Sequence, residues 1–191
     1  QTLIYLPHFL SWIILAGIMI DLLSPNGGLV NRFLGLFGAE PIFFLGSNKW
    51  FRFTLVFTDV WKEFGFGTIV YLAAITNIDP TQYEAATIDG ANRFQRIMHV
   101  TLPNMRMIIV LMMVLSLGNV LNAGFDQVYN MYSEAVYSTG DILDTFIYRL
   151  SFKNGLWGQS AAVSMFKSVV STLFISVSYL CAYKFADYRV F

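Results

Sequence analysis

Four long apolar runs make up much of this chain, and each is about as long as a membrane-spanning helix. A helix rises about 1.5 Å per residue, so roughly 20 residues cross the ~30 Å hydrocarbon core of a bilayer. A segment in that core must satisfy its own backbone hydrogen bonds, which an apolar run does by forming a helix. We therefore predict an all-α, polytopic transmembrane bundle with about four spanning helices. The runs are Leu3–Leu23, Phe51–Ile75, Pro103–Leu121 and Ser160–Phe185.

The composition agrees with a membrane environment. Hydrophobic residues make up 56% of the 191 residues and charged residues only 13%, whereas a soluble domain carries about 25% charged residues. The formal net charge is zero, which argues against a nucleic-acid partner. The sequence has one cysteine, Cys181, so an internal disulfide is excluded. It shows no metal-spaced cluster and no glycine-rich phosphate loop, so we expect no catalytic residue, metal or cofactor in this chain.

The two ends of the chain carry weaker signals. The sequence starts at Gln1 without a charged leader and enters the first apolar run almost at once, so we expect no signal peptide and an N-terminally incomplete domain. The first run is predicted as one helix with Pro7 near its start, and His8 beside it is assigned no role. The chain ends in Asp187–Arg189, which is polar enough for a cytoplasmic tail.

The second run carries three charges that lipid would not tolerate. Asp59, Lys62 and Glu63 stand at i, i+3 and i+4, so they share one helical face, where Lys62 can pair with Asp59. Charged side chains at membrane depth face the protein interior or a water-filled path. These residues are therefore candidates for the substrate path, and a structural ion-pair network is the alternative. Gly65 and Gly67 would allow a close helix approach or a bend.

A charged segment, Asp79–Pro103, separates the second and third runs. Asp79, Pro80 and Gln82 predict a helix start, with a carboxylate at the N-cap, a ring in the first turn and a reciprocal capping amide. Gly90 can take the left-handed conformation that ends this helix.

A second short helix is expected to restart at Asn92 and to stop at Leu102-Pro103, where Pro103 can also begin the third run. Helical spacing puts three apolar residues on one face and three basic residues toward water. The segment is thus predicted as a helix–turn–helix on the membrane surface. The apolar residues are Phe94, Ile97 and Met98, and the basic ones are Arg93, Arg96 and His99.

The same segment resembles the EAA loop of permease subunits of binding-protein-dependent ABC importers, which have the MetI/MalF-like fold. The family motif is E-A-A, three residues, Gly, nine residues, Ile, one residue and Leu-Pro. Here Val100 replaces the Ile, and Asp89 and Ala91 match the version common in sugar permeases. The resemblance implies an ATPase-coupling set of Tyr83, Glu84, Ala85, Ala86, Asp89, Gly90, Ala91, Val100, Leu102 and Pro103.

In such importers the loop is a cytoplasmic coupling helix that docks into a cleft of an ATPase subunit. The resemblance implies that Glu84 makes polar or ionic contacts with that cleft, that Ala85 and Ala86 form a contact surface without long side chains, and that Gly90 sets the turn. It also supplies the orientation, because the positive-inside count is a tie. The connections Ser24–Trp50 and Asn122–Trp157 are then expected outside.

The Asn122–Trp157 connection is too polar to span and is rich in aromatic residues interleaved with Asp, Asn and Gln. Such side chains could stack on sugar rings and bond their hydroxyls, and an interfacial aromatic belt is the alternative. The resemblance favours a surface that faces the solute-binding protein. In the fourth run, Lys167 needs an acceptor or a position from which it reaches the interface.

Four further strings resemble the LplB-like subunits of complex oligosaccharide importers within the sugar branch. They are YLPHF at Tyr5–Phe9, DLLSPNGGLVN at Asp21–Asn31, DVWKEFG at Asp59–Gly65 and NAGFDQVYNMY at Asn122–Tyr132.

We therefore expect residues 1–191 to be part of a six-helix permease domain, with 79–103 as its cytoplasmic EAA coupling loop. The expected function is ABC import of a carbohydrate, in particular an oligosaccharide, across the bacterial cytoplasmic (inner) membrane by a multi-pass subunit that is not an enzyme. The alternative is a permease for a peptide, amino acid or polyamine. The implied partners are ATPase subunits that bind ATP and Mg, a second permease subunit in a heterodimer, an extracytoplasmic solute-binding protein, the carbohydrate and membrane lipid.

Overall fold

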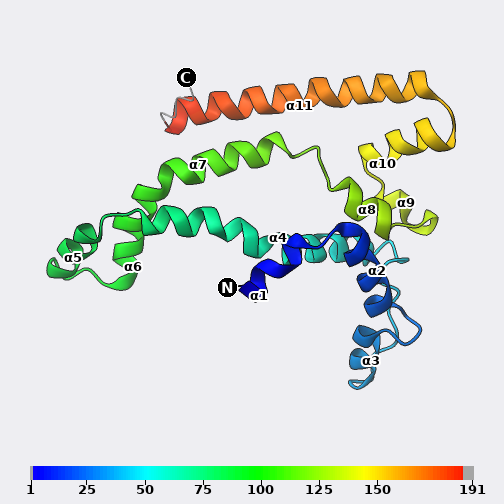
Figure 1. The fold of residues 1–191 in the computed structure, drawn as a ribbon, viewed down its shortest axis with the longest axis horizontal. Helices are drawn as coiled ribbons and strands as arrows, with labels where there is room; N and C mark the ends of the chain where they lie inside the picture. The colour runs from blue at the N-terminus through cyan, green and yellow to red at the C-terminus, as the bar shows by residue number, and fades with distance from the viewer. Residues whose placement is uncertain (1, 187–191) are drawn as a thin grey trace. The chain divides into compact units, whose positions relative to one another are not determined.

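The first apolar run folds as a broken helix, not as one span. In the computed structural model, which describes residues 2–186, the run contains α1 (Thr2–Tyr5), a 3-10 turn η1 (Leu6–Phe9) and α2 (Trp12–Leu23) (Figure 1). Ser11 is extended and its hydroxyl accepts a hydrogen bond from the Ile14 amide at 3.4 Å, so it caps α2. The prediction of one helix over Leu3–Leu23 is therefore wrong, because Pro7 and this N-cap divide the run.

All regular secondary structure in the described residues is helical, and the chain divides into two units. The first unit is Gln1–Phe66 with Leu121–Lys167, and the second is Gly67–Val120 with Ser168–Phe191. Two long helices, α4 (Phe51–Thr76) and α11 (Trp157–Ala186), contribute residues to both. The polar ending Asp187–Arg189 lies outside the described residues.

The core of the first unit forms where α2 packs against α8 (Phe125–Met131) and the start of α4. Phe51, the first residue of α4, is fully buried. Its ring lies against Gly140 so closely that a Cβ at this glycine would overlap it. The buried cluster consists of Ala16, Leu45, Phe51, Met131 and Val136.

A buried asparagine fixes the connection that follows α2. The Asn31 side chain, on α3 (Leu29–Gly35), donates to the carbonyls of Ser24 at 3.0 Å and Ile42 at 2.9 Å and accepts from the Ile42 amide at 2.8 Å. Because Asn31 is only 6% exposed, these bonds satisfy a polar group that would otherwise be costly to bury. The turn predicted at Ser24–Gly28 is present.

The Asn122–Trp157 connection folds into a series of short helices instead of an open loop. Its aromatic rings contact one another: Tyr129 lies edge-on to Tyr148 with ring centroids 4.8 Å apart, and Tyr148 lies 5.0 Å from Phe152. Aromatic pairs in these geometries add to the stability that area burial provides. After α8 come η3 (Glu134–Val136), α9 (Tyr137–Gly140), α10 (Leu143–Tyr148) and a π-helical turn, η4 (Arg149–Lys153).

In the second unit, the predicted helix–turn–helix is present, but only its first helix ends as predicted. The second helix continues into the next apolar run. The first is α5 (Pro80–Ile88), and the second runs without a stop through the elements that follow it. The prediction that Leu102-Pro103 stops the second helix is wrong, because Pro103 follows a wide π turn and sits in the first turn of the next segment, where its missing N–H is tolerated. The elements are α6 (Arg93–Arg96), η2 (Ile97–Thr101) and α7 (Leu102–Gly118).

Among the described residues, two helical runs are long and apolar enough to cross a membrane, Arg93–Leu117 and Trp157–Leu180. Their apolar side chains are largely exposed, as Met165 (71%) and Phe166 (65%) illustrate. The helix α2 has only 12 residues, and α4 carries the charges noted above. Four spans in this chain therefore remain a prediction.

Candidate functional site

Both ends of α5 are closed by local hydrogen bonds. The Asp79 carboxylate accepts from the Thr81 amide at 2.9 Å, and this bond holds the pKa of Asp79 below its ordinary value. At the other end, the Ala91 amide donates to the Ala86 carbonyl at 2.9 Å and the Gly90 amide to the Thr87 carbonyl at 3.1 Å. This is the Schellman arrangement, and Gly90 has the left-handed φ of +78° that it requires. The predicted cap residues at both ends are confirmed.

The second helix begins with a complete capping box. The Asn92 side chain accepts from the Gln95 amide at 2.9 Å, while the Gln95 side chain accepts from the Asn92 amide at 2.8 Å. The restart predicted at Asn92 is confirmed, although the reciprocal partner Gln95 was not identified from the sequence. The reciprocal role predicted for Gln82 is wrong, because its side chain accepts from Asn104 at 2.7 Å.

Side-chain bonds join the two helices of this segment to each other. The hydroxyls of Tyr83 and Thr101 lie 3.0 Å apart, and Arg96 donates to the Thr87 hydroxyl at 3.2 Å. Together with the Asn104–Gln82 bond they link α5 to the helical run 93–118 at three places. Since these bonds span the turn at Gly90, they fix the angle between the two helices.

A shallow hollow of about 370 Å³ lies in the bend of this segment. Five of the ten residues predicted for ATPase coupling line it, together with two that were not predicted, Gln95 and His99. Glu84 and Ala85 are exposed on α5, and Leu102 and Pro103 lie in the first turn of α7. The predicted residues in the hollow are Ala86, Asp89, Gly90, Ala91 and Val100.

Two apolar side chains of this segment are exposed to solvent. Ile88 is 87% exposed and Phe94 is 67% exposed. Burying an isoleucine or phenylalanine side chain of this kind contributes about 1.5–3 kcal/mol, so the segment offers a surface that a protein partner can cover.

Of the three residues predicted for the substrate path, Lys62 and Glu63 are bonded to each other and to the N-terminal segment. The Lys62 ammonium, buried on α4, donates to Glu63 at 3.0 Å and to the His8 carbonyl at 3.2 Å. The His8 imidazole donates to the other oxygen of Glu63 at 2.8 Å and stacks on Phe66. The pairing predicted for Lys62 with Asp59 is therefore wrong, and His8, to which no role was given, anchors the N-terminal segment on α4.

Gly65 is part of the same anchoring. The Ile4 carbonyl approaches this glycine so closely that no Cβ would fit, which confirms the close approach predicted there. Since His8 and Glu63 are 55 residues apart, no local pattern in the sequence indicates their contact.

Asp59 instead lines a cavity of about 470 Å³ in the first unit. The cavity is walled by α4, by the residues around the start of α8 and by the end of α9. Arg52, two helical turns before Asp59, donates to the Thr139 carbonyl at 2.6 Å. Gln127, also in the lining, is buried and donates to the Leu55 carbonyl and the Thr58 hydroxyl at 2.8 and 2.9 Å.

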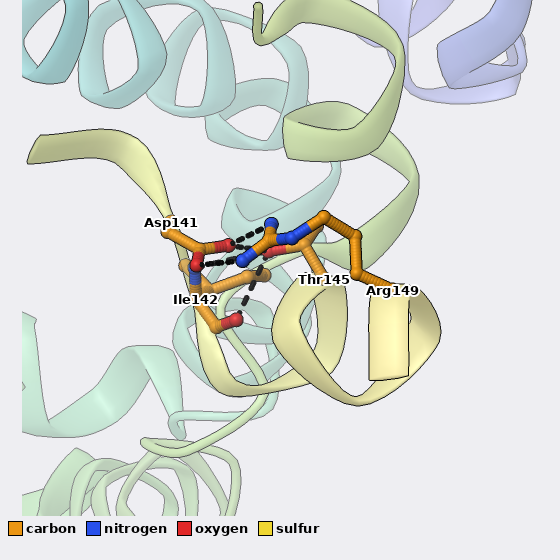
Figure 2. Close-up of polar contacts among 4 residues, drawn as sticks. All are labelled: Asp141, Ile142, Thr145 and Arg149. Atoms are coloured by element: carbon orange, nitrogen blue, oxygen red, sulfur yellow. Dashed lines mark hydrogen bonds and ion pairs between the residues drawn. The ribbon is translucent and has the colours of Figure 1, made fainter. Parts of the chain in front are cut away.

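A second carboxylate of this cavity, that of Asp141, forms an ion pair with Arg149. Figure 2 shows the Arg149 guanidinium facing the carboxylate. The two N–O distances are 2.8 and 2.5 Å, and the Thr145 hydroxyl donates to the carboxylate at 2.6 Å. Burial would raise the pKa of Asp141, but the bonds from Arg149 and Thr145 outweigh it and lower the pKa below its ordinary value. The bonds to Asp141 correspondingly raise the pKa of Arg149.

Lys167 finds the acceptor that its position in the fourth apolar run requires. Its ammonium donates to both oxygens of Asp144, at 2.6 and 2.8 Å, and to the Asn122 side chain at 2.9 Å. It therefore ties α11 to α10 and to the residues that precede α8. In the part of the chain that the structure describes, no group of three or more His, Cys, Asp or Glu side chains is placed to hold a metal ion.

Comparison with known proteins defines the class to which this architecture belongs. The model of the family "Binding-protein-dependent transport system inner membrane component" matches residues 1–190. The chain therefore belongs to this family, whose members are transport components and not enzymes.

Individual relatives agree with the family. The chain is 39% identical to the polygalacturonan/rhamnogalacturonan transport system permease protein YteP and 41% identical to protein LplB, both of Bacillus subtilis (strain 168). Each match covers all of this chain and 60% of the relative, so the chain spans about 60% of the length of these proteins. The predicted resemblance to LplB-like subunits is confirmed.

Solved structures show the same fold. A crystal structure of a bacterial ABC transporter involved in the import of the acidic polysaccharide alginate contains a chain with 38% identity and a TM-score of 0.94. That match covers 97% of this chain and 65% of the transporter chain. A second structure, in complex with an alginate pentasaccharide-bound periplasmic protein, gives a TM-score of 0.93 at 38% identity, with 96% and 64% of the two chains covered.

Proposed function

We propose that this chain is the transmembrane permease part of an ABC importer that moves a carbohydrate, in particular an oligosaccharide, across the bacterial cytoplasmic membrane. The observation that carries the proposal is the segment 79–103, whose two helices are joined by hydrogen bonds and in which five of the ten predicted coupling residues line one hollow. Apolar side chains of the same segment, Ile88 and Phe94, are exposed. Membership in the family supports transport, and the names of the polygalacturonan/rhamnogalacturonan and alginate systems support a sugar over a peptide, amino acid or polyamine.

The same comparison supports one of the proposed partners. The alginate transporter has been crystallised with a periplasmic protein that carries its pentasaccharide, which supports an extracytoplasmic solute-binding protein for this system as well. ATPase subunits on the cytoplasmic side, which bind ATP and Mg, and a second permease subunit in a heterodimer complete the proposed assembly. In it, this chain contributes about four of six spanning helices.

The proposed mechanism is alternating access. Closure of the ATPase subunits on ATP moves the segment 79–103. The hydrogen bonds that Tyr83, Thr87 and Gln82 of α5 form with the helical run 93–118 make both short helices move together. Because these hydrogen bonds oppose bending at Gly90, movement of the segment is passed on to the membrane helices. The membrane helices then change from inward- to outward-facing while the solute-binding protein delivers the sugar.

The test is a crosslink from position 86, which lines the hollow. In the full-length subunit with Cys181→Ser, we expect Ala86→Cys to form a nucleotide-dependent disulfide with a cysteine in the cleft of the co-expressed ATPase. As a matched control, Glu40→Cys lies in the connection proposed to be outside and should react with an impermeant thiol reagent in intact cells, whereas position 86 should not. Labelling of position 86 from outside, without a crosslink, would overturn both the orientation and the function.

A further inference from the structure

The short helix α3, in the first unit, leaves several large apolar side chains exposed. Leu29, Phe33 and Leu36 stand at i, i+4 and i+7, so they share one side of the helix. The Phe37 ring extends this surface, because it lies edge-on to Phe33 with ring centroids 5.2 Å apart. These four side chains, the α3 face, are between 61% and 81% exposed. Single exposed apolar residues are ordinary, but a contiguous group of this size marks an interaction surface.

A single basic residue borders the α3 face. Arg32 follows Leu29 by three residues and precedes Leu36 by four, and it is the one charged residue between Leu29 and Ala39. It is exposed, and its side chain bonds to no residue in the described range 2–186. An apolar face with a basic edge is typical of helices that lie in a membrane surface and contact anionic lipid.

Hydrogen bonds hold α3 at the level where the first apolar run ends. The last residue of α2 is Leu23, and the polar turn Ser24–Gly28 follows it. The Asn31 side chain donates to the carbonyls of both Leu23 and Ser24, at 3.3 and 3.0 Å. Gly28 approaches the end of α2 so closely that a Cβ would overlap its backbone. Since an apolar membrane segment gives way to polar residues near the lipid headgroups, α3 is fixed beside the membrane surface and not out in the water.

We propose that the α3 face enters the acyl region at the membrane surface and that Arg32 binds lipid phosphates. The inference rests on the proposed function, because it requires α2 to lie in the membrane. The apolar stem of Arg32 can stay on the α3 face while its guanidinium reaches the headgroups. The connection Ser24–Trp50, expected outside, is thereby assigned to the membrane surface over residues 29–37.

Lipid fits the α3 face better than the solute-binding protein does. A binding protein that delivers sugar must leave again, and the α3 face would then be exposed to water in every transport cycle. Exposing four large apolar side chains to water is unfavourable, and it also promotes association with other molecules. Lipid, by contrast, covers the surface throughout the cycle.

The experiment measures the depth of spin labels in the assembled importer. The full-length subunit carries Cys181→Ser, the other subunits are free of cysteine, and the complex is reconstituted in vesicles of phosphatidylethanolamine and phosphatidylglycerol. Nitroxide labels are attached to Leu29→Cys or Leu36→Cys. Their accessibility to oxygen, which concentrates in the acyl region, is compared with their accessibility to a polar nickel chelate, which stays in water.

Both labels should lie about 5–10 Å below the lipid phosphates, as the apolar face of a helix in the membrane surface does. Glu40→Cys is the matched control, since it is an exposed position of the same connection outside the α3 face, and its label should be in water. If the labels at 29 and 36 are shielded from both reagents, a protein surface covers the α3 face. If the nickel chelate reaches both labels, the face is in water. Either result overturns the proposal.

The basic edge has a test of its own. An acidic side chain is repelled by lipid phosphates, so Arg32→Glu should move the label at 36 toward the water, whereas Arg32→Lys should keep its depth. An unchanged depth in Arg32→Glu would overturn the role of Arg32.

Labels on α11 separate failure of this proposal from failure of the proposed function. Met165→Cys and Phe166→Cys lie at exposed positions of the candidate span Trp157–Leu180. If the nickel chelate reaches both of these labels, α11 does not cross the membrane and the proposed function is overturned. If oxygen reaches them preferentially but the α3 face is in water, only the role of α3 is overturned.

Discussion

Two segments of this chain, the connection 122–157 and the coupling segment 79–103, are similar in polarity. They differ in whether their side chains are paired within the chain or remain exposed. In the connection, the charged side chains Asp141 and Asp144 are paired with cations and the aromatic rings contact one another. In the coupling segment, hydrogen bonds fix the backbone and the angle between two helices, yet Ile88 and Phe94 remain exposed.

The difference indicates where each segment depends on another molecule. The connection is stabilised by contacts within its own unit, so changes to it should act mainly on folding. The coupling segment has a fixed shape and an uncovered surface, so changes to it should act mainly on association and transport. Three substitutions test this contrast, beginning with the one expected to have the largest effect.

Gly90→Val should abolish transport and substrate-stimulated ATPase activity in the purified importer. A residue with a Cβ pays roughly 1–2 kcal/mol in the left-handed conformation that Gly90 adopts, and a β-branched side chain fits it worst. The Schellman bonds would be lost and the angle between the helices with them. Gly67→Ala is the control, since a Cβ there meets no atom within 4 Å and the φ is not positive, and it should be active. A fully active Gly90→Val would show that the fixed angle is not needed.

Arg149→Met should destabilise the subunit by about 2 kcal/mol, because it leaves the half-buried Asp141 without its two charge-assisted bonds. Replacing both partners, as Asp141→Asn with Arg149→Met, should cost clearly less than the single change. Thermal unfolding of the purified subunit in detergent measures both. Equal losses in the single and double variants would indicate that packing of Arg149 on the Tyr137 ring, 4.5 Å away, dominates.

The ion pair of Asp141 and Arg149 should make the stability of the subunit depend on pH. The pKa of Asp141 is lower in the folded state than its unfolded value of about 3.9. The ionised carboxylate therefore contributes its full stabilisation above the unfolded pKa. This contribution to the free energy of unfolding is lost as the pH falls through the lower, folded pKa. The difference in stability between the wild type and Asp141→Asn should therefore be constant near neutral pH and shrink below about pH 4.

Ile88→Ser should have the smallest effect on folding, within about 0.5 kcal/mol, since this side chain is 87% exposed. Its effect should instead appear as an affinity for the ATPase subunits that is about tenfold weaker. Ile88→Leu should bind normally. Unchanged affinity of Ile88→Ser would indicate that the apolar surface contacts lipid and not a protein partner.

The parts of the structure that the sequence predicted are those that local chemistry decides. Asp79 and Gly90 cap α5 through bonds that reach no further than five residues, so composition and spacing are sufficient to find them. The need of Lys167 for an acceptor was predictable from its apolar surroundings, but the identity of Asp144 was not, because α10 brings it there.

Two of the errors have a common physical origin, which is competition between hydrogen-bond partners. Gln82 could close a capping box, but Asn104, 22 residues away, takes its side-chain oxygen. Lys62 could pair with Asp59 on its own helix, but Glu63 and the His8 carbonyl lie closer once the N-terminal segment packs against Gly65. The stop at Leu102-Pro103 failed because a π turn accommodates the proline.

The π turn η2 changes the direction in which the helix faces before and after it point. In η2 the Leu102 amide bonds to the Ile97 carbonyl, five residues back, so the turn contains one residue more than a regular α-helix. One residue corresponds to about 100° of rotation around the axis. The faces of Arg93–Arg96 and of α7 are therefore out of phase by about 100° relative to an unbroken helix. Deleting one residue from 97–101 would restore regular winding and turn Phe94 by about 100° relative to α7.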